Sequence, residues 1–492
     1  MKPYILAIDA STTGITVLIL DREAAICKKY YKEFTQYYPQ PGWVEHDGEE
    51  IWDVTYKLIQ SAFQDYSPKD CAGIGITNQR ETTLLWNRKT GQPIFNAIVW
   101  QCRRTHEICK NLQQAGNEDI FRKKTGLVLD SYFSGTKIKW LLDNVEGARE
   151  KAAKGNLAFG TIDSWLLWKL TNGAMHATDY TNASRTMVFN IDTKKWDEEL
   201  LQILTIPSNL LPDVKFSSGE FGKTDKQLFG EVIPITGIAG DQQAALYGQG
   251  CFESGDTKCT YGTGCFLLTN TGNNRVNSSS GLLTTIFCNK DGKPVYGLEG
   301  SVFIGGAVIQ WLRDELQLLS QTPDSEEMAL AVEDSNGVVI VPAFTGLGAP
   351  YWDMDARGII TGLTRGANRN HIVRAALECI AYQVNDLVEA VFSDLDLTAN
   401  SLQVDGGATA NNFLMQFQAD LLRLKIDRSK NIESTALGAG MLAGLGSGFW
   451  KNPSELITIR KSDKMFIPSM PEDIRTNLLA NWRMAVRKTQ CT

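Results

Sequence analysis

The chain has 492 residues and a formal net charge of −7, a length that allows roughly two to four domains with full-sized cores. No basic domain or stripe stands out, which argues against a nucleic-acid-binding protein. No apolar run approaches the ~18 residues of a membrane span, and no signal peptide is recognisable at the N-terminus, so we expect a cytoplasmic protein with no membrane partner.

Short β-branched runs alternate with helical patterns along the chain, which predicts an α/β fold. The first element is a hairpin, in which residues 4–8 and 15–20 form strands around a polar turn. Asp9 at the strand end can hold Mg²⁺ through water, and the hydroxyls of Thr12 and Thr13 can face phosphate oxygens. The alternative is an ordinary turn in which these side chains form only local hydrogen bonds.

A dense polar cluster follows the next buried strand, in the segment G-I-T-N-Q-R-E-T-T at 75–83. Arg80 donates in a planar fork and Glu81 accepts on two oxygens, and this pairing suits the vicinal hydroxyls of a polyol. The alternative is an ion-pairing surface loop. Three aromatic residues can pack on the carbon side of a polyol, although each singly is more typical of a core: Trp100, Tyr132 and Phe266.

A strand-like run at 232–238 leads through small residues to Asp241. A carboxylate there can accept the proton of an attacking hydroxyl, or it can simply cap the helix that the following residues predict. Just before it, S-S-G-E-F-G-K-T at 217–224 departs by one residue from the P-loop pattern. Since no buried strand leads into that segment, we expect a surface turn there.

The middle of the chain repeats the opening arrangement. Residues 256–260 predict a strand, Y-G-T-G at 261–264 a turn and the apolar run after it a second strand. We therefore expect two domains, 1–247 and 248–492, each contributing one hairpin to clamp a triphosphate. Further on, V-D-G-G at 404–407 predicts a strand entering a glycine turn, which allows close backbone approach to a nucleotide.

Two helices follow from the apolar pattern of the second half. The residues after Asn370 predict a helix with a buried face that Asn370 caps. A second helix is predicted at 411–422, directly after the glycine turn.

Together these segments resemble the FGGY carbohydrate kinase family, over about residues 4 to 450, and within it the members that phosphorylate glycerol. The resemblance is carried by G-I-T-N-Q-R-E-T-T (75–83), N-A-I-V-W-Q-C-R-R-T (96–105), D-Y-T-N-A-S-R-T-M (179–187), G-I-A-G-D-Q-Q-A-A-L (237–246), T-Y-G-T-G-C-F (260–266), V-P-A-F-T-G-L-G-A-P-Y-W (341–352) and V-D-G-G (404–407). It implies two actin-like, ribonuclease H-like ATPase domains with mixed sheets flanking an interdomain cleft.

The resemblance also implies the activity and the roles of single residues. The reaction is ATP-dependent phosphorylation of glycerol, in glycerol uptake and catabolism, by a homo-oligomer (dimer or tetramer). Asp241 is the implied base, and Asp9 and Asp241 are the implied Mg²⁺ ligands. The implied glycerol contacts are Arg80, Glu81, Trp100, Tyr132, Asp241, Gln242 and Phe266. The implied ATP contacts are Thr12, Thr13, Gly14, Thr263, Gly306, Gln310, Gly407 and Asn411.

Two positions depart from the family pattern. Ser11 stands where relatives have glycine, and it costs on the order of 1 kcal/mol if its φ is positive. Thr16 stands where many relatives have arginine, which removes a positive charge near the phosphates. One alternative that these two positions motivate is a non-catalytic binding protein on the kinase fold. A second alternative, independent of them, is a kinase of another polyol or sugar.

Overall fold

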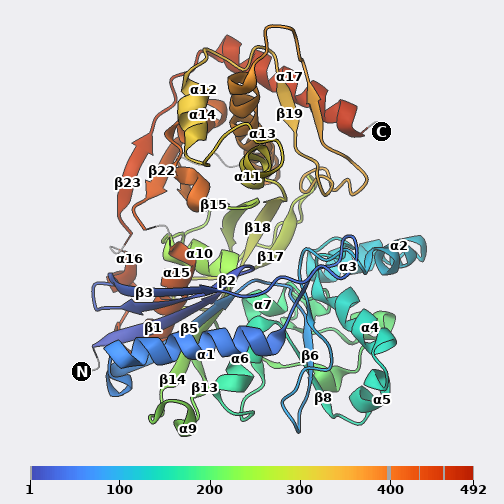
Figure 1. Cartoon of the computed structure of the whole chain (residues 1–492). Helices are drawn as coiled ribbons and strands as arrows, with labels where there is room; N and C mark the ends of the chain where they lie inside the picture. The colour runs from blue at the N-terminus through green and yellow to red at the C-terminus, as the bar shows by residue number, and fades with distance from the viewer. Residues whose placement is uncertain (1–2, 396–400, 432, 458–459, 491–492) are drawn as a thin grey trace.

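The computed structural model describes residues 3–395, 401–431, 433–457 and 460–490. Two mixed sheets, one in each half of the molecule, organise the fold (Figure 1). The first runs in the order β13 (Ser218–Lys223), β14 (Pro234–Gly240), β5 (Cys71–Asn78), β1 (Tyr4–Ala10), β2 (Gly14–Leu20) and β3 (Ile26–Glu33). The second runs in the order β17 (Leu283–Cys288), β18 (Pro294–Val302), β16 (Cys265–Gly272), β15 (Thr257–Tyr261), β21 (Ser401–Asp405), β22 (Lys425–Ser429) and β23 (Ser462–Phe466).

The two sheets share one pattern of strand pairing. In each, three consecutive antiparallel strands continue into two parallel ones and end in an antiparallel edge strand: β3-β2-β1-β5-β14-β13 and β18-β16-β15-β21-β22-β23. Both predicted hairpins, β1–β2 and β15–β16, are therefore confirmed as equivalent elements. The exact boundary between the two halves stays a prediction.

The helices surround these sheets. In the first half they are α1 (Gly48–Asp65), α2 (His106–Gln114), α3 (Glu118–Thr125), α4 (Ser134–Asn144), α5 (Ala148–Ala153), α6 (Ile162–Leu170), α7 (Tyr180–Ala183), α8 (Glu198–Leu204), α9 (Lys226–Phe229) and α10 (Asp241–Gly248). Later in the chain come α11 (Ala307–Asp314), α12 (Asp324–Leu330), α13 (Arg369–Leu395), α14 (Asn412–Leu422), α15 (Ser434–Gly446), α16 (Ser454–Ile457) and α17 (Glu472–Gln490).

Among the residues that the structure describes, short strands form five two-stranded pairs beside the main sheets. They are β4 (Glu45–His46) with β7 (Ala97–Ile98), β6 (Leu84–Asn87) with β8 (Leu157–Gly160), β9 (Ala177–Asp179) with β12 (Asp213–Lys215), β10 (Phe189–Asn190) with β11 (Lys195–Trp196), and β19 (Val339–Val341) with β20 (Ile359–Thr361). Within the described part of the chain, no helix is both long and apolar enough to cross a membrane.

The central strand β1 is buried on both faces, because a helix covers each one. Leu6 and Ile8 belong to the core that contains α1, whereas Ile5 and Ala7 belong to the core that contains α15. The close approach of α15 depends on Gly75 in β5, where a Cβ atom would collide with the carbonyl of Ala439. A helix from late in the chain is thus locked onto the first sheet.

Two local predictions were wrong. The segment predicted as a surface turn contains the edge strand β13, because Gly222 and Lys223 pair with β14. The cap of α13 is Asn368 rather than Asn370, since the Asn368 side chain accepts from the backbone N–H groups of Asn370 and His371.

Candidate active site

Polar residues gather where three parallel strands of the first sheet end. Asp9 pairs in register with Thr77 of β5, and Ala239 and Gly240 of β14 pair with β5 on its other side. Asp9 and Asp241 therefore stand at the same sheet edge on either side of β5. Their backbones are about 10 Å apart, which is two strand spacings of ~4.8 Å. Their carboxylates interact: the pKa of Asp9 is raised to about 7, mainly by burial and in part by the charge of Asp241, while a hydrogen bond from Ser11 opposes the shift.

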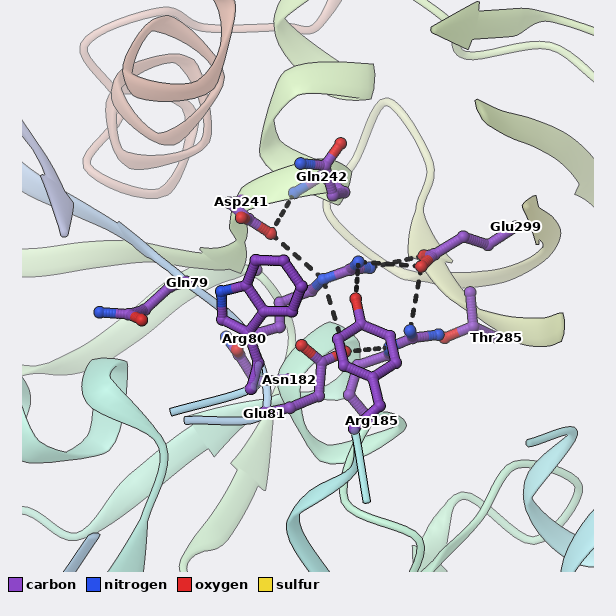
Figure 2. A network of polar contacts seen from close by, with 12 residues as sticks. Gln79, Arg80, Glu81, Asn182, Arg185, Asp241, Gln242, Thr285 and Glu299 are labelled. Carbon is purple, nitrogen blue, oxygen red and sulfur yellow. Dashed lines mark hydrogen bonds and ion pairs between the residues drawn. The ribbon is translucent and has the colours of Figure 1, made fainter. Parts of the chain in front are cut away.

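Arg80 and Glu81 are buried at this edge, with 2% and 1% of their surface exposed. The alternative of an ion-pairing surface loop is therefore wrong. Arg80 forms a fork on Glu299, with Nη1 donating to Oε2 at 2.6 Å and Nη2 to Oε1 at 2.9 Å. Its Nε lies 3.1 Å from Asp241 Oδ1 (Figure 2).

Glu81 has a left-handed backbone, with φ at 60°. Such a conformation is costly for a residue with a Cβ atom and is kept only when neighbours hold it. The Glu81 carbonyl accepts from Ser134 Oγ and from Lys137 Nζ, both at 3.1 Å. Its carboxylate accepts from Arg185 Nε at 2.6 Å. Burial raises the pKa of Glu81, and the charges of Arg80 and Arg185 oppose this shift.

The three predicted aromatic residues form one group beside this cluster. The ring of Trp100 lies 5.6 Å from that of Tyr132 and 6.2 Å from that of Phe266. Trp100 Nε1 also donates to Thr12 Oγ1 at 3.0 Å, which ties the group to the first hairpin. These edge-to-face contacts present apolar surface close to the polar fork.

Asp241 is the first residue of α10, and its side chain is 26% exposed. The residue before the helix is Gly240, so the prediction that Asp241 caps the helix is wrong. Asp241 Oδ1 accepts from the backbone N–H of Gln242 at 2.7 Å. Burial raises the pKa of Asp241, while Arg80, this hydrogen bond and Lys258 lower it.

A cavity of about 500 Å³ lies in the second half, bordered by the β15–β16 turn. Five of the residues predicted to contact ATP line it: Thr263, Gly306, Gln310, Gly407 and Asn411. Leu377, Ile380 and Leu414 add an apolar wall. A mostly apolar cleft of this size with a few polar groups is typical of a nucleotide site.

The other predicted ATP contacts do not line this cavity: Thr12 and Thr13 lie in the turn between β1 and β2, and Gly14 is the first residue of β2. Ser11 in that turn is not among the described residues with positive φ, so the strain expected there does not arise. Instead, Ser11 Oγ donates to Asp9 Oδ1 at 2.9 Å. Serine is therefore compatible with this turn and helps to orient the Asp9 carboxylate.

Three charged residues of the cluster were not singled out from the sequence. Arg185 and Glu299 contact Arg80 or Glu81, and Lys258 donates to Gln242 Oε1 at 2.8 Å. Lys258 is buried, and burial lowers its pKa. Arg185 and Lys258 stand in or beside the family-like strings, but only the folded structure shows what they contact.

The arrangement has no protein-only metal cage, since no group of three or more His, Cys, Asp or Glu side chains suited to a metal ion occurs in the described ranges. Mg²⁺ in kinases usually takes only one or two carboxylates and fills its other positions with phosphates and water. The neighbouring carboxylates of Asp9 and Asp241, whose mutual repulsion a cation would relieve, fit that pattern.

The fold is that of a two-domain ATPase of the actin-like class. The model for "FGGY family of carbohydrate kinases, N-terminal domain" matches residues 4–248, and that for the C-terminal domain matches 257–447. The chain therefore belongs to the FGGY family of carbohydrate kinases.

Individual relatives and solved structures show which members of the family this chain resembles. The glycerol kinase of Carboxydothermus hydrogenoformans is 58% identical over 492 residues, covering 99% of this chain and 98% of the relative. That of Caldanaerobacter subterraneus subsp. tengcongensis is 57% identical over 490 residues, covering 99% of each chain. The crystal structure of Plasmodium falciparum glycerol kinase with ADP is 40% identical, with a TM-score of 0.92 over 99% of this chain and 98% of that one. Ligand-bound xylulose kinase from Lactobacillus acidophilus, 22% identical with a TM-score of 0.87 over 99% and 97% of the chains, shows the shared fold alone.

Proposed function

We propose that the protein transfers the γ-phosphoryl group of ATP to glycerol, giving sn-glycerol 3-phosphate and ADP. The observation that carries this proposal is the convergence of the buried Arg80 and Glu81 with the partly exposed Asp241 at one strand edge. A small neutral triol offers only hydroxyl groups, and fixed charged donors and acceptors bind these more strongly than neutral ones. The relatives named glycerol kinase support the same substrate.

In this proposal Asp241 accepts the proton of the glycerol hydroxyl that attacks the γ-phosphorus. A base works best when its pKa lies close to the operating pH, and burial moves the pKa of Asp241 in that direction. The new bond forms between the hydroxyl oxygen and phosphorus, and the bond to the β-phosphate oxygen breaks, so that ADP leaves. Arg80 Nε beside Asp241 holds the carboxylate in one orientation.

The other residues bind and align. Arg80, Glu81, Tyr132 and Gln242 supply polar contacts to the triol, and Trp100 and Phe266 supply its apolar wall. Thr263, Gly306, Gln310, Gly407 and Asn411 hold ATP from the second half, and Thr12, Thr13 and Gly14 approach its phosphates from the first. Phosphoryl transfer depends mainly on such alignment and on charge neutralisation. Burial of the site excludes the water that would compete for the γ-phosphate.

We assign Mg²⁺ binding to Asp9 and Asp241. When bound, the ion would neutralise charge on the phosphate oxygens. The hydroxyl of Ser11 keeps Asp9 oriented toward the cleft end of β1. A dimer or tetramer, a cytoplasmic location and a part in glycerol uptake and catabolism stay predictions.

The test is ADP release by the purified protein with Mg·ATP, with and without glycerol. Release that depends on glycerol supports the proposal. No release with glycerol, while calorimetry still detects glycerol binding, would indicate a non-catalytic binding protein. A panel of tetritols and pentuloses separates the remaining alternative, because a higher kcat/KM for one of them would assign the site to another polyol or sugar.

A further inference from the structure

A buried ion-pair cluster joins the two halves of the molecule beside the proposed glycerol site. Glu299 comes from β18 of the second sheet, where it pairs with Leu268 and Leu283, and none of its side chain is exposed. Arg80 and Arg185 come from the first half, after β5 and α7. Figure 2 shows both arginines turned toward this one carboxylate.

Both oxygens of the Glu299 carboxylate accept hydrogen bonds from these arginines. Oε1 accepts from Arg80 Nη2 and from Arg185 Nη2, both at 2.9 Å, and Oε2 accepts from Arg80 Nη1 at 2.6 Å. Ser301 Oγ adds a contact to Oε1 at 3.3 Å. Charge-assisted bonds of this geometry are among the strongest hydrogen bonds in proteins, and the fork on Arg80 fixes a plane as well as a distance.

Electrostatics makes Glu299 necessary for this arrangement. Burial raises the pKa of Glu299, but Arg185 and Arg80 outweigh it and lower the pKa to about 2. Without the carboxylate, the two buried guanidinium groups would share only Glu81, whose Oε1 lies 2.6 Å from Arg185 Nε and 3.8 Å from Arg80 Nε, and the terminal nitrogens that now bond to Glu299 would lose their counter-charge. Leaving a buried charge unpaired is strongly unfavourable, so the arginines would move.

The fork on Glu299 decides which donors of Arg80 remain for a substrate. It occupies one hydrogen on each terminal nitrogen, and Gln243 Oε1 takes another from Nη1 at 3.1 Å. The weaker contacts are those of Nη2 to Tyr132 Oη at 3.4 Å and of Nε to Asp241. Both lie beside predicted glycerol-binding groups, so a glycerol hydroxyl can replace or share them.

Arg185 holds the Glu81 carboxylate in place, as Glu299 holds Arg80. Its Nε bonds to Glu81 Oε1 at 2.6 Å, while its Nη2 is held by Glu299. The orientation of the Glu81 carboxylate is therefore linked through Arg185 to a residue of the other half.

We propose that Glu299 and Arg185 are positioning residues for the polyol: Glu299 fixes Arg80, Arg185 fixes Glu81, and the second half thereby completes a pocket whose polar contacts come from the first. This inference rests on the proposed function, since it assigns Arg80 and Glu81 to glycerol. It predicts that glycerol recognition, and not nucleotide binding, depends on two residues that touch no substrate.

The test compares steady-state kinetics of Glu299→Gln and Glu299→Asp with the wild type. We expect Glu299→Gln to raise the KM for glycerol at least tenfold and to leave the KM for ATP within twofold. Glu299→Asp keeps the charge and should recover part of the loss. The ratio of kcat/KM for glycerol to that for 1,3-propanediol, which lacks vicinal hydroxyls, should fall in Glu299→Gln, and a merely structural role would not change it.

A matched control is available at Glu378, a buried carboxylate that accepts from Arg374 Nε at 2.8 Å. Glu378→Gln breaks a buried pair of the same kind and should leave the KM for glycerol within twofold. Thermal unfolding and ADP binding by calorimetry check that each variant is folded. If Glu299→Gln does not fold, Arg185→Lys decides: a rise of fivefold or more in the KM for glycerol supports the inference, and a smaller change refutes it.

The two proposals fail in different ways. A wild type that releases no ADP with glycerol refutes the proposed function, and the positioning inference falls with it. A wild type that is active, together with a folded Glu299→Gln whose KM for glycerol and substrate ratio are unchanged, refutes the positioning inference alone.

Discussion

Replacing Asp241 by Asn tests the proposed base directly. Asparagine keeps an oxygen that can accept from the backbone N–H of Gln242, now at 2.7 Å, and it places a neutral oxygen beside Arg80 Nε, which now lies 3.1 Å from Asp241 Oδ1. The substitution removes two properties of the side chain: its negative charge and its ability to accept a proton. General bases contribute ~10²–10⁴-fold, so kcat should fall by that factor, equivalent to about 3–5 kcal/mol in the barrier.

The assay is coupled ADP detection at saturating Mg·ATP with glycerol varied. The KM for glycerol should change less than kcat, because the neighbouring contacts remain. Asp163→Asn is the matched control: Asp163 is also buried, with its pKa raised by burial to about 7, but it bonds to Thr161 and Thr178 outside the site. We expect its kcat within twofold of wild type. A folded Asp241→Asn with kcat within threefold of wild type would refute the assignment of the base.

Three further predictions follow from single features. The fold favours the neutral form of Asp163, so the wild type loses stability as the pH rises from about 4 to 7. The free energy of unfolding of Asp163→Asn, measured with urea, should therefore rise relative to that of the wild type by up to ~4 kcal/mol between these two pH values. An equal difference between variant and wild type at both pH values would contradict this. Gly406→Ala should destabilise by ~1–3 kcal/mol, because φ is 92° and a Cβ would lie 2.5 Å from the Tyr261 carbonyl oxygen. Gly407→Ala meets no atom within 4 Å and should leave the unfolding midpoint unchanged while raising the KM for ATP; equal midpoints for the two variants would show the backbone argument to be wrong. Removal of Mg²⁺ by chelation should abolish ADP release and leave calorimetric glycerol binding intact, and turnover in excess chelator would exclude the Mg²⁺ assignment.

The two hairpins were predictable from short segments because each is a local element. A strand, a turn of small residues and a second strand define each hairpin within about a dozen neighbouring positions, and the apolar runs give the strands. The glycine turn at 404–407 likewise appears where predicted, after β21 and before α14. The five residues that line one cavity, Thr263, Gly306, Gln310, Gly407 and Asn411, were in contrast predicted as a set by the family resemblance.

The polyol end was predictable only in part, because its residues meet across long stretches of chain. Arg80 and Glu299 are separated by 219 positions, and Arg185 and Glu299 by 114. A glutamate inside a buried strand has no local signal for its partner, and only the fold supplies it. The conformation of Ser11 was not predictable for a related reason: the sequence shows that serine replaces glycine but not which φ the turn requires.

This division has a physical origin. A triphosphate carries its own charge and can be held by backbone N–H groups and small hydroxyls, which any tight turn presents. A triol carries no charge, so its alignment must come from side-chain charges that are already fixed before it binds. Fixing two buried guanidinium groups demands a counter-charge in a third place, and here β18 of the opposite sheet provides it. Under the proposed function, the choice of substrate depends on contacts between the halves, whereas each hairpin supplies its share of the nucleotide contacts from a short local segment.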